Sequence, residues 1–153
     1  MSYEHFEEDL RKGIKAEEGM KEMLKKEKPT LKKYEGYNPD YDLYDDFGYT
    51  AEVKLDIASG RSDNIAIEYL CEGKISGISR TKAEDWIHIY KFENEWVYTR
   101  CKVEDLKKFI KGSKEKLKRV AGGDDKNSML LLIKKEKFIN AFGLEKIKGI
   151  ANK

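Results

Sequence analysis

Asp42, Glu52 and Lys54 are the residues of this sequence whose types and spacing best suit chemistry. If residues 49–55 form a strand, alternate side chains share a face, so Glu52 and Lys54 point the same way. A carboxylate and an ammonium group on one face must lie against something polar. A divalent metal ion together with a phosphate group would fit there.

A β-hairpin would bring Asp42 next to Glu52. The turn signal lies at residues 45–48, where Gly48 can take the left-handed conformation. A three-residue loop at 46–48 sets Asp42 directly opposite Glu52, with Cβ atoms about 5 Å apart. Two carboxylates so placed repel each other unless they share a cation. Asp40 has the same strand parity and competes with Asp42, but Asp42 is preferred because it lies opposite Glu52.

Composition limits the architecture and the compartment. The chain has 153 residues, of which 39% are apolar and 39% charged. This length is enough for one domain with a hydrophobic core, so we expect a single domain over residues 1–153. No apolar run is long enough to span a membrane, and the N-terminus lacks a signal-peptide pattern. Cys71 and Cys101 lack metal or redox spacing and are interpreted as thiols of a reducing compartment. We therefore expect an intracellular, cytoplasmic protein with no membrane partner.

The charge is uneven although the net charge is only +2. Residues 34–56 are strongly acidic and residues 102–119 strongly basic. An acidic pocket beside basic walls suits a metal ion and a polyanion. The alternative is that the Lys and Glu residues simply solvate the surfaces of helices.

The hydrophobic pattern predicts an α/β or α+β domain with a mixed central β-sheet flanked by helices. The expected helices are 3–26, a short one from a capping box at Thr81, a basic amphipathic one from Val103 to about Val120, and 135–142. The expected strands are 41–44, 49–55, 64–70, 86–92, 96–101 and 129–133.

The order Asp42, Glu52-Val53-Lys54, preceded by a literal Pro39-Asp40, resembles the PD-(D/E)xK nuclease superfamily, which has the restriction-endonuclease-like fold. In that family a helix precedes a hairpin that carries Asp and then Glu-x-Lys, and further strands and a helix follow. The pattern of this chain predicts the same order.

Two further segments carry the resemblance, which covers roughly residues 5–100. Residues 13–17, Gly-Ile-Lys-Ala-Glu, look like the Gly-x-x-Ala-Glu of the first helix in archaeal-type Holliday junction resolvases, where the Glu is an active-site carboxylate. Residues 64–68, 76–78 and 81–86 look like a stretch seen in phage and prokaryotic members of the superfamily.

The resemblance implies Mg²⁺-dependent hydrolysis of DNA phosphodiester bonds, which needs an in-line hydroxide and positive charge on the non-bridging oxygens. Asp42 and Glu52 would bind Mg²⁺, for which Mn²⁺ is expected to substitute, and the Val53 carbonyl could add a ligand. Lys54 would orient the attacking water. Glu17 would complete the site or help to hold a second metal ion.

Other residues have both a functional and an ordinary interpretation. Glu68 shares a strand face with Ala66 and is either a site member or an exposed strand glutamate. Hydroxyl groups that could meet phosphate, or merely cap loops, belong to Ser76, Ser79 and Thr81. The lysines of the basic helix, Lys108 and Lys111 among them, line DNA or form a solvated face. The isolated His5 and His88 are not expected to act as bases, and Trp86 and Trp96 are expected in the core or on a sheet face.

The sequence therefore predicts a metal-dependent deoxyribonuclease acting on duplex or branched DNA, with a junction-resolving endonuclease as the leading subtype. Exonucleases and nickases of the superfamily are alternatives, as is a non-catalytic nucleic-acid-binding domain that retains the fold. Resolvases act as two-fold dimers, so that subtype implies a homodimer. The phage-like segments are compatible with a phage- or virus-encoded protein that acts in a host cell.

Overall fold

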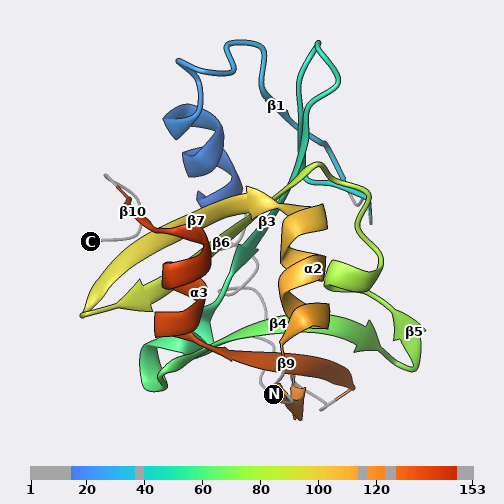
Figure 1. Ribbon diagram of the computed structural model, residues 1–153. Helices are drawn as coiled ribbons and strands as arrows, with labels where there is room; N and C mark the ends of the chain where they lie inside the picture. The colour runs from blue at the N-terminus through green and yellow to red at the C-terminus, as the bar shows by residue number, and fades with distance from the viewer. Residues whose placement is uncertain (1–14, 37–39, 114–116, 123–126, 148–153) are drawn as a thin grey trace, which may run out of the picture.

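Two β-sheets organise the computed structural model, which describes residues 15–36, 40–113, 117–122 and 127–147 (Figure 1). The first sheet has six strands in the order β1-β2-β3-β6-β7-β10, and the second has four in the order β5-β4-β9-β8. The strands of the first sheet are β1 (Lys32–Lys33), β2 (Leu43–Tyr44), β3 (Thr50–Leu55), β6 (Asp85–Phe92), β7 (Glu95–Lys102) and β10 (Glu145–Lys146). Those of the second are β4 (Asn64–Cys71), β5 (Lys74–Ile75), β8 (Lys118–Gly122) and β9 (Ser128–Lys134).

The first sheet is mixed, because β3 and β6 run parallel while its other neighbours are antiparallel. A parallel pair needs a long crossover connection. Here the crossover contains the 3₁₀ helix η1 (Ile57–Arg61), the strands β4 and β5, and a second 3₁₀ helix, η2 (Gly77–Ser79). The chain between the two central strands therefore builds half of the second sheet.

Both faces of the first sheet are covered. On one face, Ala51 and Val53 pack against a helix over residues 15–23, which buries Ala16 and Met20 at helical spacing. On the other face lie the inner side of the second sheet and the helices α2 (Val103–Gly112) and α3 (Lys135–Phe142). In Figure 1 these two helices stand in front of β6 and β7, and β4 and β9 cross below them. Strand β6 is buried along most of its length, which explains its nearly continuous apolar sequence.

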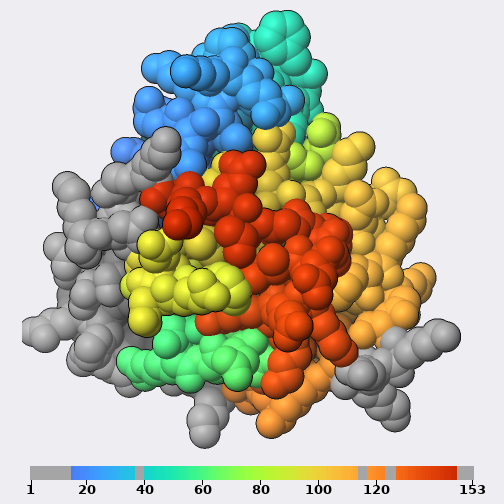
Figure 2. Space-filling view, turned by 60° about the vertical axis from the view of Figure 1, so that its left-hand side comes forward, coloured from blue at the N-terminus to red at the C-terminus, as the bar shows by residue number. Residues whose placement is uncertain are grey.

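The space-filling view shows how the N-terminal part caps the molecule (Figure 2). The blue residues after residue 14 and the teal loop between β2 and β3 form the top, above the red segment of α3 and β10. Among the described residues, no helix has the length and apolar character needed to cross a membrane. Cys101 is buried and Cys71 half-buried, and both are free thiols.

The structure corrects the predicted secondary structure at several points, and the strand predicted at 41–44 is limited to Leu43–Tyr44. The basic helix ends at Gly112, and residues 118–122 form the edge strand β8, which pairs with β9. Gly112 is a poor helix former, and a Lys/Arg-rich edge strand is a common way to prevent strand pairing between molecules. The strand predicted at 64–70 is present as β4, but it belongs to a second sheet rather than to a single central one.

No helix begins at Thr81, because its hydroxyl group accepts a hydrogen bond from the N–H of Ala83, two residues on. The N–H of Glu84 then donates to the Thr50 carbonyl, and β6 begins at the next residue. In the first predicted helix, residues 3–14 lie outside the described residues, and residues 24–27 form a turn after the helix.

Candidate active site

A cluster of carboxylates and lysines lies where β2 separates from β3. The two strands pair at Leu43↔Ala51 and Tyr44↔Thr50, so the next position sets Asp42 opposite Glu52, as predicted. Asp42 Oδ2 accepts a hydrogen bond from the Val53 N–H at 2.8 Å. Because the N–H and C=O of one strand residue point to the same side, the Val53 carbonyl also faces the edge at which Asp42 lies.

Local turn chemistry fixes this register. Asp45 Oδ1 accepts hydrogen bonds from the N–H groups of Phe47 and Tyr49, at 2.9 and 2.8 Å. Gly48 has φ +90, a conformation that suits glycine, and the backbone N–H of Asp45 donates to the Tyr49 carbonyl. The turn thus holds Asp42 and Glu52 in one rigid hairpin.

Glu52 and Lys54 point to the same side of β3, toward the second sheet. Lys54 Nζ lies 3.4 Å from Glu52 Oε2, and the Thr81 hydroxyl lies 3.3 Å from Glu52 Oε1. Glu52 is only 7% exposed. Its carboxylate is therefore held from both ends, by an ammonium group from its own strand and by a hydroxyl group from the loop before β6.

Glu17 reaches the same strand edge from the opposite face of the sheet. It lies on the helix over residues 15–23, and its Oε2 is 4.0 Å from Nζ of Lys33 on β1. Both side chains are largely buried. The charges of Asp42, Glu52 and Lys54 act on Glu17, so the cluster encircles the free edge of β3.

Burial raises the pKa values of these carboxylates, and for Glu17 and Glu52 neighbouring carboxylates add to the rise. Burial raises the pKa of Glu17 to about 7, and the neighbouring Asp42 adds to this. Burial also raises the pKa of Glu52 to about 7, with Asp42 adding and Lys54 opposing. Burial raises the pKa of Asp42, although the hydrogen bond from the Val53 N–H and the charges of two lysines oppose the rise. Negative charge is therefore costly here, and a cation would relieve the cost.

Lys54 also faces a carboxylate of the second sheet. Burial alone would lower the pKa of Lys54, but Glu52, Asp42 and Glu68 outweigh it and hold this pKa above its usual value. Lys54 and Glu68 line a cleft of about 240 Å³, whose other walls include Ala66 and Leu130. The cleft lies between β3 and the second sheet, next to the carboxylate cluster.

Asp40 has a different role from Asp42. Its Oδ1 pairs with Arg80 Nη1 at 2.7 Å, and its carbonyl accepts hydrogen bonds from the Thr81 hydroxyl and the Lys82 N–H. These bonds tie the segment before β2 to the loop before β6. Asp42, not Asp40, is the residue opposite Glu52.

The cluster offers a small set of oxygen donors for a metal ion. Among the residues that the structure describes, no group of three His, Cys, Asp or Glu side chains is arranged to hold a metal ion. Mg²⁺ commonly uses one or two carboxylates and keeps several waters. Asp42, Glu52 and the Val53 carbonyl satisfy that smaller requirement, and their oxygen atoms are the ligand type that Mg²⁺ prefers.

The residues predicted to contact DNA are scattered. Ser79 is exposed, Thr81 is buried beside Glu52, and Ser76 has a buried Oγ atom with no partner in the part of the chain that the structure describes. Lys108 and Lys111 are exposed on α2, where Lys108 pairs with Glu104 at 3.3 Å. Of this set, the contact of Thr81 with Glu52 links it directly to the cluster.

Buried aromatic residues beside the cluster are structural. The indole N–H of Trp86 donates to His88 Nδ1 at 3.1 Å, so the other ring nitrogen of His88 carries the proton and donates to Asp56 Oδ2 at 3.0 Å. Asp56 also accepts hydrogen bonds from the N–H groups of Ser59 and Ala66. This network joins η1, β4 and β6 to the end of β3, and both ring nitrogens of His88 take part in it. His5 lies outside the described residues.

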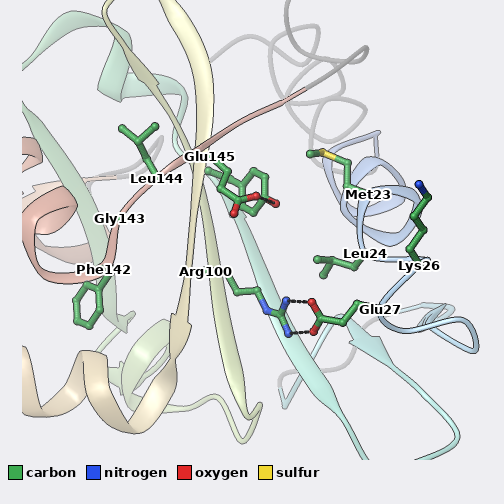
Figure 3. Close-up of a pocket in the computed structure, with 10 residues that line it drawn as sticks. Met23, Leu24, Lys26, Glu27, Arg100, Phe142, Gly143, Leu144 and Glu145 are labelled. Atoms are coloured by element: carbon green, nitrogen blue, oxygen red, sulfur yellow. Dashed lines mark hydrogen bonds and ion pairs between the residues drawn. The ribbon is translucent and has the colours of Figure 1, made fainter.

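A separate hollow of about 400 Å³ lies between the turn after the first helix and the segment after α3 (Figure 3). Arg100 is its central charged residue. Its guanidinium forms two hydrogen bonds with Glu27, at 3.1 and 2.8 Å, and its Nε bonds to Asp85 at 2.9 Å. Since these bonds tie the turn to the sheet, we interpret the hollow as structural.

Sequence reasoning missed Lys33 and did not commit to Glu68. Lys33 lies in a run of polar and basic residues, and only its place on β1, beside Glu17, distinguishes it. For Glu68 the signal was present, because a carboxylate alternates there with buried isoleucines. Comparisons of the chain with protein-family models, with curated proteins and with solved structures found no match. Its function must therefore be inferred from this geometry.

Proposed function

We propose that the protein is a Mg²⁺-dependent DNA nuclease with a restriction-endonuclease-like core. One observation carries the proposal: Glu17, Asp42, Glu52 and Lys54, which come from separate parts of the sequence, converge on the free edge of β3. The described order of a helix, a hairpin with Asp and then Glu-x-Lys, and further strands and helices supports the same family. The coarse class, a mixed α and β fold, is compatible with this core but does not require it.

The chain's own residues have clear tasks in this reaction. Asp42 and Glu52 would hold Mg²⁺, which supplies an activated water and positive charge on the phosphoryl oxygens. Lys54, held 3.4 Å from Glu52, would donate a hydrogen bond to the attacking water and favour its deprotonated form. The Thr81 hydroxyl, which bonds to the Asp40 carbonyl, also lies 3.3 Å from the other oxygen of Glu52 and would help to orient this carboxylate before substrate binds.

Glu17 supports the junction-resolving subtype. The resolvase-like segment ends in Ala16-Glu17, where Ala16 is buried against the sheet and Glu17 reaches the cluster. The glycine that begins the segment, Gly13, lies outside the described residues. A homodimer is part of this refinement, because a four-way junction has two-fold symmetry.

Incubation with four-way junction, duplex and single-stranded DNA, in Mg²⁺ or in EDTA, tests the proposal. Wild-type protein should cleave at least one substrate in Mg²⁺ alone, and Lys54→Ala should reduce the rate by about 10²-fold or more. Lys146→Ala is the matched control, because Lys146 is exposed and pairs with Glu95.

Three outcomes would contradict parts of the proposal. Absence of Mg²⁺-dependent cleavage would refute the enzyme, and salt-sensitive DNA binding in that case would identify a non-catalytic binding domain. Cleavage that is unchanged in Lys54→Ala would refute the site. Equal cleavage of all three DNA forms would refute the junction-resolving subtype.

A further inference from the structure

Aromatic side chains of the β2–β3 hairpin and of the segment after β1 lie beside the carboxylates. Tyr34, Tyr41 and Tyr44 contact one another, with ring centroids 5.9 to 6.4 Å apart. Tyr41 and Tyr44 are half-buried, whereas Tyr34 is 38% exposed and Phe47, in the loop at the tip, is 83% exposed. In Figure 1 this loop stands free at the top of the molecule, far from the second sheet. So much aromatic surface at an exposed hairpin requires an explanation.

The tyrosines are continuous with the proposed catalytic cluster. Tyr44 pairs with Thr50 and Asp42 follows the same alternation opposite Glu52, so Tyr44 and Asp42 share a face of the hairpin. The N–H of Tyr34 donates to the Asp42 carbonyl at 2.8 Å, which places residue 34 beside residue 42. A DNA strand bound at the carboxylates would therefore run next to the tyrosines.

We propose that the exposed rings of Tyr34 and Phe47, together with the half-buried Tyr41 and Tyr44, form an aromatic platform on which the bases of an unpaired DNA strand stack. The proposal rests on the nuclease function and names its substrate class. Aromatic rings bind bases through their flat faces, and in a duplex those faces are already stacked on each other. The platform thus favours single-stranded segments, such as flaps, splayed arms or open branch points, over continuous duplex.

The hairpin also limits how far the contacts extend. Phe47 lies in the loop at the tip, five residues from Asp42 along the chain, and therefore at most about 16 Å from it at about 3.3 Å per residue. At about 3.4 Å per stacked nucleotide, Phe47 would contact a base at most about five nucleotides from the cleaved bond. An unpaired segment of eight nucleotides is therefore long enough to reach it.

The test separates binding from cleavage. Oligonucleotides labelled with 2-aminopurine, as single strands, duplexes and splayed arms with two or eight unpaired nucleotides, are titrated in EDTA and then cleaved in Mg²⁺. Tyr34→Ala and Phe47→Ala should weaken binding of single strands about 5-fold to 100-fold and leave duplex binding unchanged. Tyr34→Phe and Phe47→Trp should keep wild-type affinity. Ile75→Ala, in an exposed residue of the β4–β5 hairpin, is the control and should change nothing.

Each result bears on one of the two proposals. Normal cleavage with no effect of Tyr34→Ala or Phe47→Ala would overturn the platform and leave the nuclease intact. Base stacking without cleavage would support the platform and refute the nuclease. Equal losses on single strands and duplex, or a change only in self-association, would overturn the choice of an unpaired strand. No effect of Phe47→Ala on arms of eight nucleotides would overturn the contact at the tip.

Discussion

Glu52→Gln should stabilise the metal-free protein above neutral pH, because the fold holds this carboxylate at a cost. Its pKa rises from 4.5 to about 7, first through burial and then through Asp42. A carboxyl group with a raised pKa in the folded state contributes stability that is complete below about pH 4.5 and is lost as the pH rises through 7. At about 1.4 kcal/mol per pKa unit, this loss is about 3 kcal/mol. Glutamine has no such loss.

Urea denaturation in EDTA at pH 4.5, 6 and 8, followed by tryptophan fluorescence, measures the effect. Between pH 4.5 and 8, the free energy of unfolding of Glu52→Gln should rise by up to about 3 kcal/mol relative to wild type. Glu95→Gln, in an exposed ion pair, should show no such trend. Mg²⁺ at about 100 times its Kd should add about 2.7 kcal/mol to the wild type at pH 8 and little to Glu52→Gln. A difference that does not change with pH would refute the reasoning.

Three further substitutions test the identity of the metal ligand and the packing behind Glu68, which lines the cleft. Asp42→Asn should abolish Mg²⁺-dependent cleavage, whereas Asp40→Asn should retain most of it, because Asp40 pairs with Arg80. Cleavage rates of both variants on one DNA substrate test this assignment of the metal ligand. Equal losses of rate would contradict it. Gly77→Ala should lower the free energy of unfolding, measured by urea titration, by about 2 kcal/mol or more. The reason is that φ of Gly77 is +50 and the new Cβ would lie 2.1 Å from the Glu68 carbonyl oxygen. Unchanged stability would show that the loop shifts freely.

Features governed by local chemistry could be predicted from the sequence. The hairpin register follows from Asp45 and Gly48, whose bonds and conformation span a few residues. The last helix has the predicted bounds, Lys135–Phe142, because its apolar spacing is regular and Gly143, with φ +78, ends it. These elements contain the information for their own boundaries.

Features governed by distant partners could not be predicted. Residues 118–122 have the composition of an exposed helix, yet they pair with β9 as an edge strand. Nothing local separates β4 from the strands of the first sheet, because alternation indicates a strand and not its neighbour. In the site, Lys33 and Glu17 come together only because the first helix packs against the sheet that contains β1. The spacing of Asp42, Glu52 and Lys54 predicted these three site residues, whereas Glu17 was predicted from the resemblance to the resolvases.

Strand β4 is far from its partner β9 in the sequence, and this distance affects the order in which the two sheets can form. Strand β4 leaves the ribosome soon after β3, but it pairs mainly with β9, whose Ser128–Lys134 are made much later. Closing so long a loop costs entropy before its hydrogen bonds form, whereas the β2–β3 hairpin closes over a few residues. A nascent chain can therefore form the hairpin with Asp42 and Glu52 while Glu68 still lacks a fixed place. The cleft beside Lys54 is complete only after β9, which supplies Leu130 to its lining, has emerged.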